Sequence, residues 1–178
     1  MKRGFLLLSI IAALTGCAGG PAVRGAKQVP VRNVVLYRSG VGYFERSGTF
    51  EGESLEFKVK QDEVGDFLSS LTAIERTSGG VRSVSFDVPD VPSKPVDPDA
   101  PAPEPSRERV DVKLSLAGGG KHDVSVAYVV GSPIWRPSYR VVLDGKDKAL
   151  LQAWAVVQNT SGDDWRDVNL SLTTGAPI

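Results

Sequence analysis

The strict alternation of apolar and polar residues from Arg109 onward constrains the fold more than any other feature of this sequence. Side chains of a β-strand point alternately to the two faces of a sheet, so a period of two predicts strands with one buried and one exposed face. The apolar positions of the first two segments are Val110, Val112, Leu114, Leu116, Val124, Val126, Tyr128 and Val130. A glycine-rich turn at 117–121 separates the two segments, and we expect them to form a hairpin.

The same pattern continues toward the C-terminus. Residues 136–159 predict a second hairpin, because Asp144 and Gly145 form a dipeptide that favours hairpin turns. A last strand follows, in which the apolar positions are Val168, Leu170 and Leu172. Five strands at intervals of about 8 to 15 residues are typical of a β-sandwich or an open barrel of antiparallel strands.

The segment 31–88 combines strands with one change of period. Strands are predicted at 31–37, 43–50, 54–60 and 81–88. Between the last two, the apolar residues lie at i, i+3, i+4 and i+7, which is the spacing of one helical face, and they are Val64, Phe67, Leu68 and Leu71. Asp62 is the predicted N-cap of this helix. We therefore expect a mainly β fold with one short helix in an N-terminal α+β part.

A proline-rich run divides the chain. Seven prolines lie between Pro89 and Pro105, and proline is poorly tolerated inside helices and central strands. We interpret 89–109 as a solvated loop or linker; the alternative is a recognition segment for a proline-binding partner. The division predicts an N-terminal β-rich domain at 31–88 and a C-terminal β-domain at 110–178. We expect the second domain to be incomplete, with open sheet edges.

The first residues have the three-part pattern of a secretory signal. Lys2 and Arg3 precede an apolar run, Phe5 to Leu14. As a helix, Gly4 to Leu14 would extend about 16 Å, which is roughly half of a hydrocarbon core of about 30 Å, so it is too short to span a membrane. We predict a lipoprotein signal peptide at 1–16.

The residues "LTGC", 14–17, resemble the lipobox of bacterial lipoproteins. This resemblance implies that Cys17, the only cysteine of the chain, is acylated and becomes the mature N-terminus, so that the lipid bilayer is a partner. The alternative is an ordinary signal peptide cut near Ala18. We expect 17–30 to be a flexible tether. Because Ala18 rather than Asp follows the cysteine, we expect a lipid-anchored envelope protein at the outer membrane, facing the periplasm.

Composition limits the remaining function classes. Lys plus Arg and Asp plus Glu number 21 each, and without Lys2 and Arg3 there are 19 basic against 21 acidic residues. Nucleic acid is therefore not an expected partner. One His and one Cys do not supply the ligands of a zinc site. The glycine-rich turn lacks the spacing of a phosphate-binding loop, so we expect no metal and no cofactor.

Two groups of residues are candidate binding sites. The large aromatics of the C-terminal part either form a sugar-stacking platform or are buried at strand ends, and they are Trp135, Tyr139, Trp154 and Trp165. The second group is acidic and either serves as calcium ligands, as the acids of a glycosidase or as ordinary turn residues; it consists of Asp163, Asp164 and Asp167, next to Asn169.

His122 is the only histidine, and it lies beside Asp123. The chain has no G-x-S-x-G motif to supply a nucleophile. We therefore predict a solvent-facing strand residue at this position and no catalytic residues.

Several motifs resemble the mucoidy-inhibitor-like family, a bacterial group classed as a domain of unknown function. The sequence contains "WRPSY" at 135–139 and "VVQNTSGDDWRDVNLSLTTGAP" at 156–177, which resemble its W-x-P-x-Y, N-x-T/S-G-x-D-W and L-S-T-G-x-P elements. Segments upstream, "LYRSGVGYFERSG" and "FLSSLTAIERTSGGVRSVSFD", resemble its exported members. The resemblance implies an envelope location and a β-rich architecture, with no established catalytic residues. Chains of the family continue beyond the T-G-x-P element, so we expect a fragment or a truncated relative.

Two functional hypotheses follow. The preferred one is a non-enzymatic lipoprotein that binds another envelope component, either a protein through an open sheet edge or a glycan through its aromatics. The alternative is a hydrolase acting on envelope polysaccharide or peptidoglycan, with Asp163, Asp164 or Asp167 as its acids.

Overall fold

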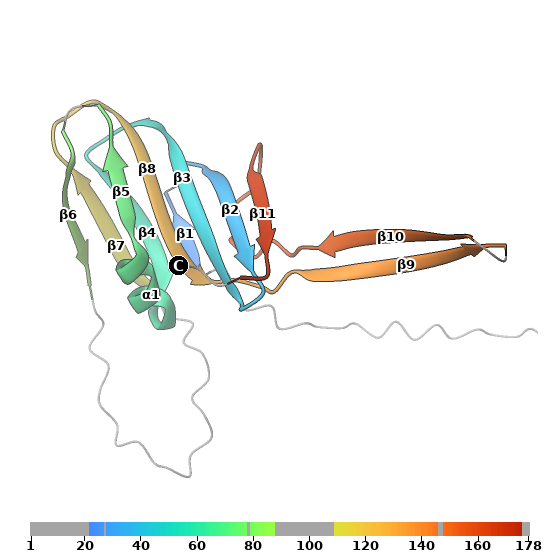
Figure 1. The fold of residues 1–178 in the computed structure, drawn as a ribbon. Helices are drawn as coiled ribbons and strands as arrows, with labels where there is room; N and C mark the ends of the chain where they lie inside the picture. Colours follow the sequence, from blue (N-terminus) through green and yellow to red (C-terminus); the bar gives the residue numbers. More distant parts are fainter. Residues whose placement is uncertain (1–21, 27, 78, 88–108, 146–147, 176–178) are drawn as a thin grey trace, which may run out of the picture.

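The computed structural model describes residues 22–26, 28–77, 79–87, 109–145 and 148–175. The signal segment with Cys17, and the proline run, lie outside these residues. Two β-sheets pack face to face, and a two-stranded hairpin extends away from them (Figure 1). The predicted fold class is confirmed, because the described chain is mainly β with a single short helix, and no sheet closes into a barrel.

The two sheets contain four and five strands. The first sheet has the order β1 (Val23–Gly25), β4 (Ser54–Lys60), β7 (Arg109–Leu116) and β6 (Val81–Phe86). The second has the order β11 (Asn169–Thr173), β2 (Val31–Tyr37), β3 (Val41–Glu51), β8 (Lys121–Gly131) and β5 (Thr72–Glu75). All neighbours in both sheets are antiparallel except β11 and β2, which are parallel.

The core lies between the two sheets. Alternate residues of β4 and β7 face alternate residues of β2, β3 and β8, so each strand buries the apolar half of its period-two pattern. One end of the core is covered by the turn η1 (Gln61–Glu63) and the helix α1 (Val64–Ser70). Phe67 of the helix is fully buried, with its ring centroid 4.9 Å from that of Tyr128 and 5.5 Å from that of Phe57.

The helix uses the predicted face but not the predicted cap. Val64, Leu68 and Leu71 pack against the core beside Phe67. The N-cap is Glu63 rather than Asp62, because η1 adds a turn before the helix. The Glu63 carboxylate accepts a hydrogen bond of 2.9 Å from the backbone N–H of Gly131. The helix therefore starts where Glu63 ties it to the end of β8.

The predicted hairpin of the first two C-terminal segments is wrong. Both segments are strands, β7 and β8, but β7 pairs with β4 and β6 in the first sheet, whereas β8 pairs with β3 and β5 in the second. The turn between them crosses from one sheet to the other, and Gly118 and Gly120 in it have positive φ angles of 86° and 107°. The apolar faces of β7 and β8 therefore meet across the core instead of lying side by side.

The segment expected to be a tether also contributes to the fold. Val23–Gly25 forms β1, which pairs with β4, and Val29 is fully buried. Strands from before and after the proline run share both sheets, since β7 lies between β4 and β6 and β8 lies between β3 and β5. Strands from 31–88 and from 110–178 therefore build one sandwich together.

We predict that Phe67→Ala lowers the free energy of unfolding by about 3–5 kcal/mol, because it removes a ring buried among two other rings. Denaturant unfolding followed by circular dichroism measures the change. Phe86→Ala is the matched control, because this ring lies on β6 and is exposed. Equal losses in both variants would contradict the assigned core.

Candidate functional site

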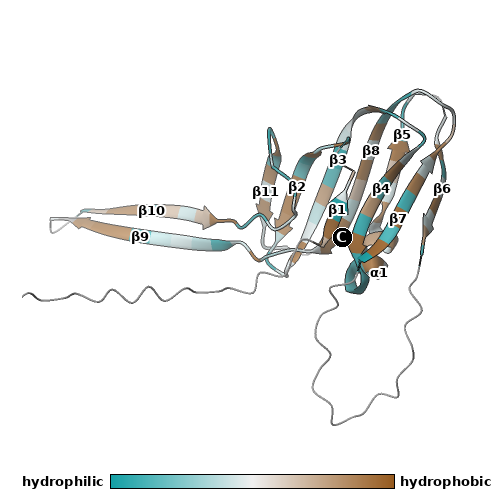
Figure 2. Cartoon of the chain, turned by 180° about the vertical axis from the view of Figure 1, so that it is seen from behind, coloured by the Kyte–Doolittle hydropathy of each residue, from teal (hydrophilic) through white to brown (hydrophobic). Residues whose placement is uncertain are grey.

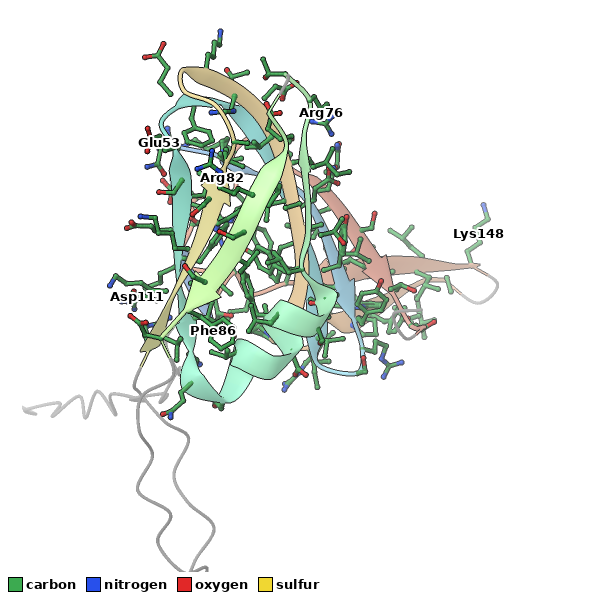
Figure 3. The ribbon with its side chains drawn as sticks, turned by 90° about the vertical axis from the view of Figure 1, so that its left-hand side faces the viewer. Glu53, Arg76, Arg82, Phe86, Asp111 and Lys148 are labelled. Carbon is green, nitrogen blue, oxygen red and sulfur yellow. The ribbon has the colours of Figure 1, made fainter. Side chains whose placement is uncertain are left out.

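The hairpin β9 (Arg136–Asp144) and β10 (Lys148–Val156) is the most unusual part of the molecule. Its strands pair only with each other among the described strands and project beyond the sandwich (Figure 1). Figure 3 shows Lys148 at the outer end of this hairpin, away from Arg82 and Phe86 at the sandwich edge. We call this hairpin the arm. The prediction of a hairpin at 136–159 is confirmed.

One face of the arm consists entirely of apolar residues. Residues opposite each other in an antiparallel pair lie on the same face, so the register defines the two faces. The apolar face comprises Pro137, Tyr139, Val141 and Leu143 of β9, opposite Ala155, Ala153, Leu151 and Ala149 of β10. All eight side chains are exposed, Leu143 to 75%, Tyr139 to 64% and Leu151 to 63%. Exposed apolar surface of this kind marks interaction sites.

The opposite face of the arm is mixed. It comprises Arg136, Ser138, Arg140 and Val142 of β9, opposite Val156, Trp154, Gln152 and Leu150 of β10. Figure 2 shows hydrophilic residues toward the root of β9 and hydrophobic residues along the outer half of both strands. The mixed face therefore combines an exposed indole, two guanidinium groups and amide and hydroxyl groups near the root.

The root of the arm is fixed by contacts with the sandwich. Trp135 packs against the core just before β9, and its indole N–H donates a 3.1 Å hydrogen bond to the backbone oxygen of Thr173. Val157 packs against the core just after β10. Because both ends are held, the arm projects from a defined position.

The chain after the arm is organised by Asn159. Its side-chain oxygen accepts hydrogen bonds from the backbone N–H and the hydroxyl of Ser161, at 3.0 and 2.7 Å. Its side-chain nitrogen donates to the backbone oxygen of Asp163 at 2.8 Å. The indole N–H of Trp165 donates to the Ser161 hydroxyl at 3.0 Å. These bonds give the N-x-T/S-G-x-D-W element a structural role as a turn closed by side chains.

A buried guanidinium anchors this turn. Arg46 of β3 is only 1% exposed, and it donates to the Tyr128 hydroxyl oxygen at 3.0 Å and to the backbone oxygen of Val29 at 3.2 Å. Its third nitrogen, Nη2, donates to the carboxylate of Asp163. Burial by itself lowers the pKa of Arg46, but its contacts with Tyr128 and Asp163 more than offset this, so the pKa lies above its ordinary value. The arginine therefore remains charged and paired inside the protein.

The four candidate aromatics do not form one platform. Trp135 and Trp165 are partly buried against the core and act as anchors. Tyr139 and Trp154 are exposed, but they lie on opposite faces of the arm. Trp135 and Trp165 therefore follow the interpretation of aromatics buried at strand ends. Tyr139 and Trp154 are the two that remain exposed.

The candidate acids are also separated in their roles. Asp163 is held by Arg46, whereas Asp164 is 82% exposed and lies 3.3 Å from Arg166. Asp167 is exposed and has a positive φ of 53°, as expected for a turn residue. Within the described ranges, no three His, Cys, Asp or Glu side chains form a group suited to a metal ion.

The prediction that His122 faces solvent is wrong. Its side chain is buried, and Nδ1 lies 3.3 Å from a carboxylate oxygen of Glu75. The reason is visible in the alternation, since His122 lies two residues before Val124 and belongs to the same buried series of β8. Backbone N–H groups, first that of Gly80 and then those of Thr77 and Gly79, hold the pKa of Glu75 well below its usual range despite burial. Sequence reasoning missed this pair because no motif connects residues 75 and 122.

We predict that Asp163→Ala lowers the free energy of unfolding by about 3 kcal/mol, because it leaves the Arg46 guanidinium buried without a counter-ion. Asp164→Ala should change it by less than about 0.5 kcal/mol, since this carboxylate is exposed. Chemical unfolding of the two neighbouring variants gives the comparison. A loss of stability in Asp164→Ala that matches the loss in Asp163→Ala would contradict the anchoring role of the Arg46 pair.

Among the described residues, no helix is long and apolar enough to cross a membrane. The family model of a domain of unknown function (DUF4139) matches residues 124–178. This range runs from within β8 through the arm and the Asn159 turn to the end of the chain. The search of curated proteins found no match, and neither did the search of solved structures. The part of this chain that is similar to a domain family of unknown function thus contains the arm and the Asn159 turn, together with most of β8 and all of β11.

Proposed function

We propose that this protein is a lipid-anchored component of the bacterial cell envelope, related to the mucoidy-inhibitor-like family, that binds another envelope component through its arm. The single observation that carries the binding role is the arm itself, two exposed nine-residue strands outside both sheets. Exposed apolar strands with open edges associate with other chains, so this surface supports a binding role.

The arm is suited to a protein partner. Each of its strands has an outer edge, and an extended strand spans about 30 Å over nine residues. An edge of this length offers backbone N–H and C=O groups to an added strand, and the side chains above and below it supply specificity. A glycan partner is less well supported, because the exposed aromatics Tyr139 and Trp154 lie on opposite faces.

The hydrolase hypothesis has less support. A glycosidase acid must be free to reach the glycosidic bond, and Asp163 is committed to Arg46. Asp164 and Asp167 are exposed turn residues. We therefore propose a binding protein and not an enzyme.

The anchor would lie near the root of the arm. Ala22 lines a small cavity together with Ser132 and Gln158, which flank the arm. Four residues lie between Cys17 and Ala22, so five residue steps give a reach of at most about 18 Å. An acylated Cys17 would therefore hold the arm root close to the bilayer, at the outer membrane and facing the periplasm in our proposal.

We predict that the chain labels with a fatty-acid analogue in a bacterial host and stays with the membranes, whereas Cys17→Ser does not label and leaves the membrane fraction. Gel fluorescence and fractionation report the two properties. An unlabelled wild-type product cut near Ala18 would refute the anchor.

A photo-reactive amino acid at Trp154, on the exposed mixed face, should crosslink to a second envelope component in living cells. The same amino acid at Lys58, on the outer face of β4, is the control, since that side chain is exposed but distant from the arm in sequence and in sheet. The mass of the adduct identifies what is captured. Identical adducts at both positions would contradict binding through the arm.

A further inference from the structure

We infer that the apolar face of the arm binds the same face of a second copy of this chain, with the two arms stacked about a two-fold axis parallel to their strands. The inference rests on one part of the proposed function, the lipid anchor, because the anchor places both copies on the same membrane. It leaves the outer edges and the mixed faces available to the envelope partner.

The apolar face carries no charge. Its eight residues are Pro, Tyr, Val, Leu, Ala, Leu, Ala and Ala, and the charged residues Arg136, Arg140 and Lys148 all lie on the opposite face. Two copies of this face therefore meet without like-charge repulsion. The fully buried part of a homodimer interface typically has this composition, depleted of charged residues.

The size of the side chains on this face makes it complementary to itself. The β9 half carries Pro137, Tyr139, Val141 and Leu143, whereas three of the four residues on the β10 half are alanines. One half of the face is thus a ridge and the other half is a shallow groove. Packed layers interdigitate when large residues of one layer face small residues of the other.

Only one symmetric stacking brings the ridge onto the groove. A two-fold axis parallel to the strands, midway between the stacked arms, puts β9 of one copy over β10 of the other. Register partners remain at the same height, so Tyr139 of one copy lies over Ala153 of the other, and Leu143 over Ala149. An axis perpendicular to the strands would instead put ridge on ridge and leave the alanine halves apart.

The chosen axis also suits a shared membrane. Both arms point in the same direction, so the two sandwiches and the two Ala22 residues, which lie near the arm roots, are at the same end of the pair. With the perpendicular axis the arm roots would be separated by the full strand length, about 30 Å. Two anchored chains can therefore form the parallel pair without leaving their bilayer.

The area of the face predicts a weak contact in solution. Two strands about 30 Å long and 4.8 Å apart cover roughly 300 Å², whereas a stable interface buries about 800 Å² on each partner. Confinement to one membrane raises the effective concentration of the two arms. We therefore expect the pair to form between chains anchored to the same membrane, and the test uses membrane-anchored chains.

Crosslinking of the full chain in membranes tests the inference. Cys17 is the only native cysteine, so Leu143→Cys introduces a defined thiol on the apolar face near the arm tip. Val142→Cys is the matched control, because it is the adjacent residue on the mixed face. A short bis-maleimide should give dimers of Leu143→Cys at a yield at least five-fold above Val142→Cys, with the parent chain as background. Equal yields, or no dimer from either variant, would overturn the inference.

A second variant separates a specific pair from general apolar association. Adding Ala153→Leu to Leu143→Cys fills the groove that receives Tyr139, so the dimer yield should fall several-fold. An unchanged or higher yield would mean that the face merely seeks apolar surroundings such as lipid, and would refute the ridge-and-groove pair. The test of the proposed function is independent of this one. The crosslink at Trp154 produces an adduct whose mass differs from that of two identical chains.

Discussion

The buried Arg46 guanidinium is the constraint on which the rest of the molecule depends. A charge enclosed between two sheets costs several kcal/mol unless it is paired and hydrogen-bonded. Arg46 achieves this with one partner inside the sandwich, Tyr128, and two from the chain around it, Val29 and Asp163. The segment before β2 and the turn after the arm are thereby fixed to the same side chain.

This arrangement explains why the arm has a defined root. The Asn159 turn presents the Asp163 carboxylate to Arg46, and Trp165 closes the turn through Ser161. On the other side of the arm, Trp135 binds the backbone of β11. Three of the seven candidate binding residues, Trp135, Trp165 and Asp163, therefore hold the arm in place. The exposed strands of the arm form the candidate interaction surface.

The sequence predicted the strands well because alternation follows directly from the geometry of a sheet. Val110 to Leu116 and Val124 to Val130 are buried at every second residue, as expected. Alternation does not specify which strand lies beside which, so β7 and β8 were wrongly paired, and it does not distinguish an arm from a sheet, so β9 and β10 were expected inside the sandwich. The pairs Glu75–His122 and Arg46–Asp163 were missed for a related reason, because no local pattern connects the two members of either pair.

The parallel pairing of β11 with β2 has a consequence for how the chain acquires its structure. β2 begins at Val31, and its last neighbour arrives only with Asn169, so the second sheet stays open on that side while the intervening chain is made. Arg46 likewise lacks its carboxylate until Asp163 emerges. Contacts across such sequence separations form slowly, because a long loop must close first. The edge of the second sheet beside β2 and the ion pair of Arg46 therefore form only after residues 163–173 have been made, whereas β3, β4, β7 and β8 can pair before them.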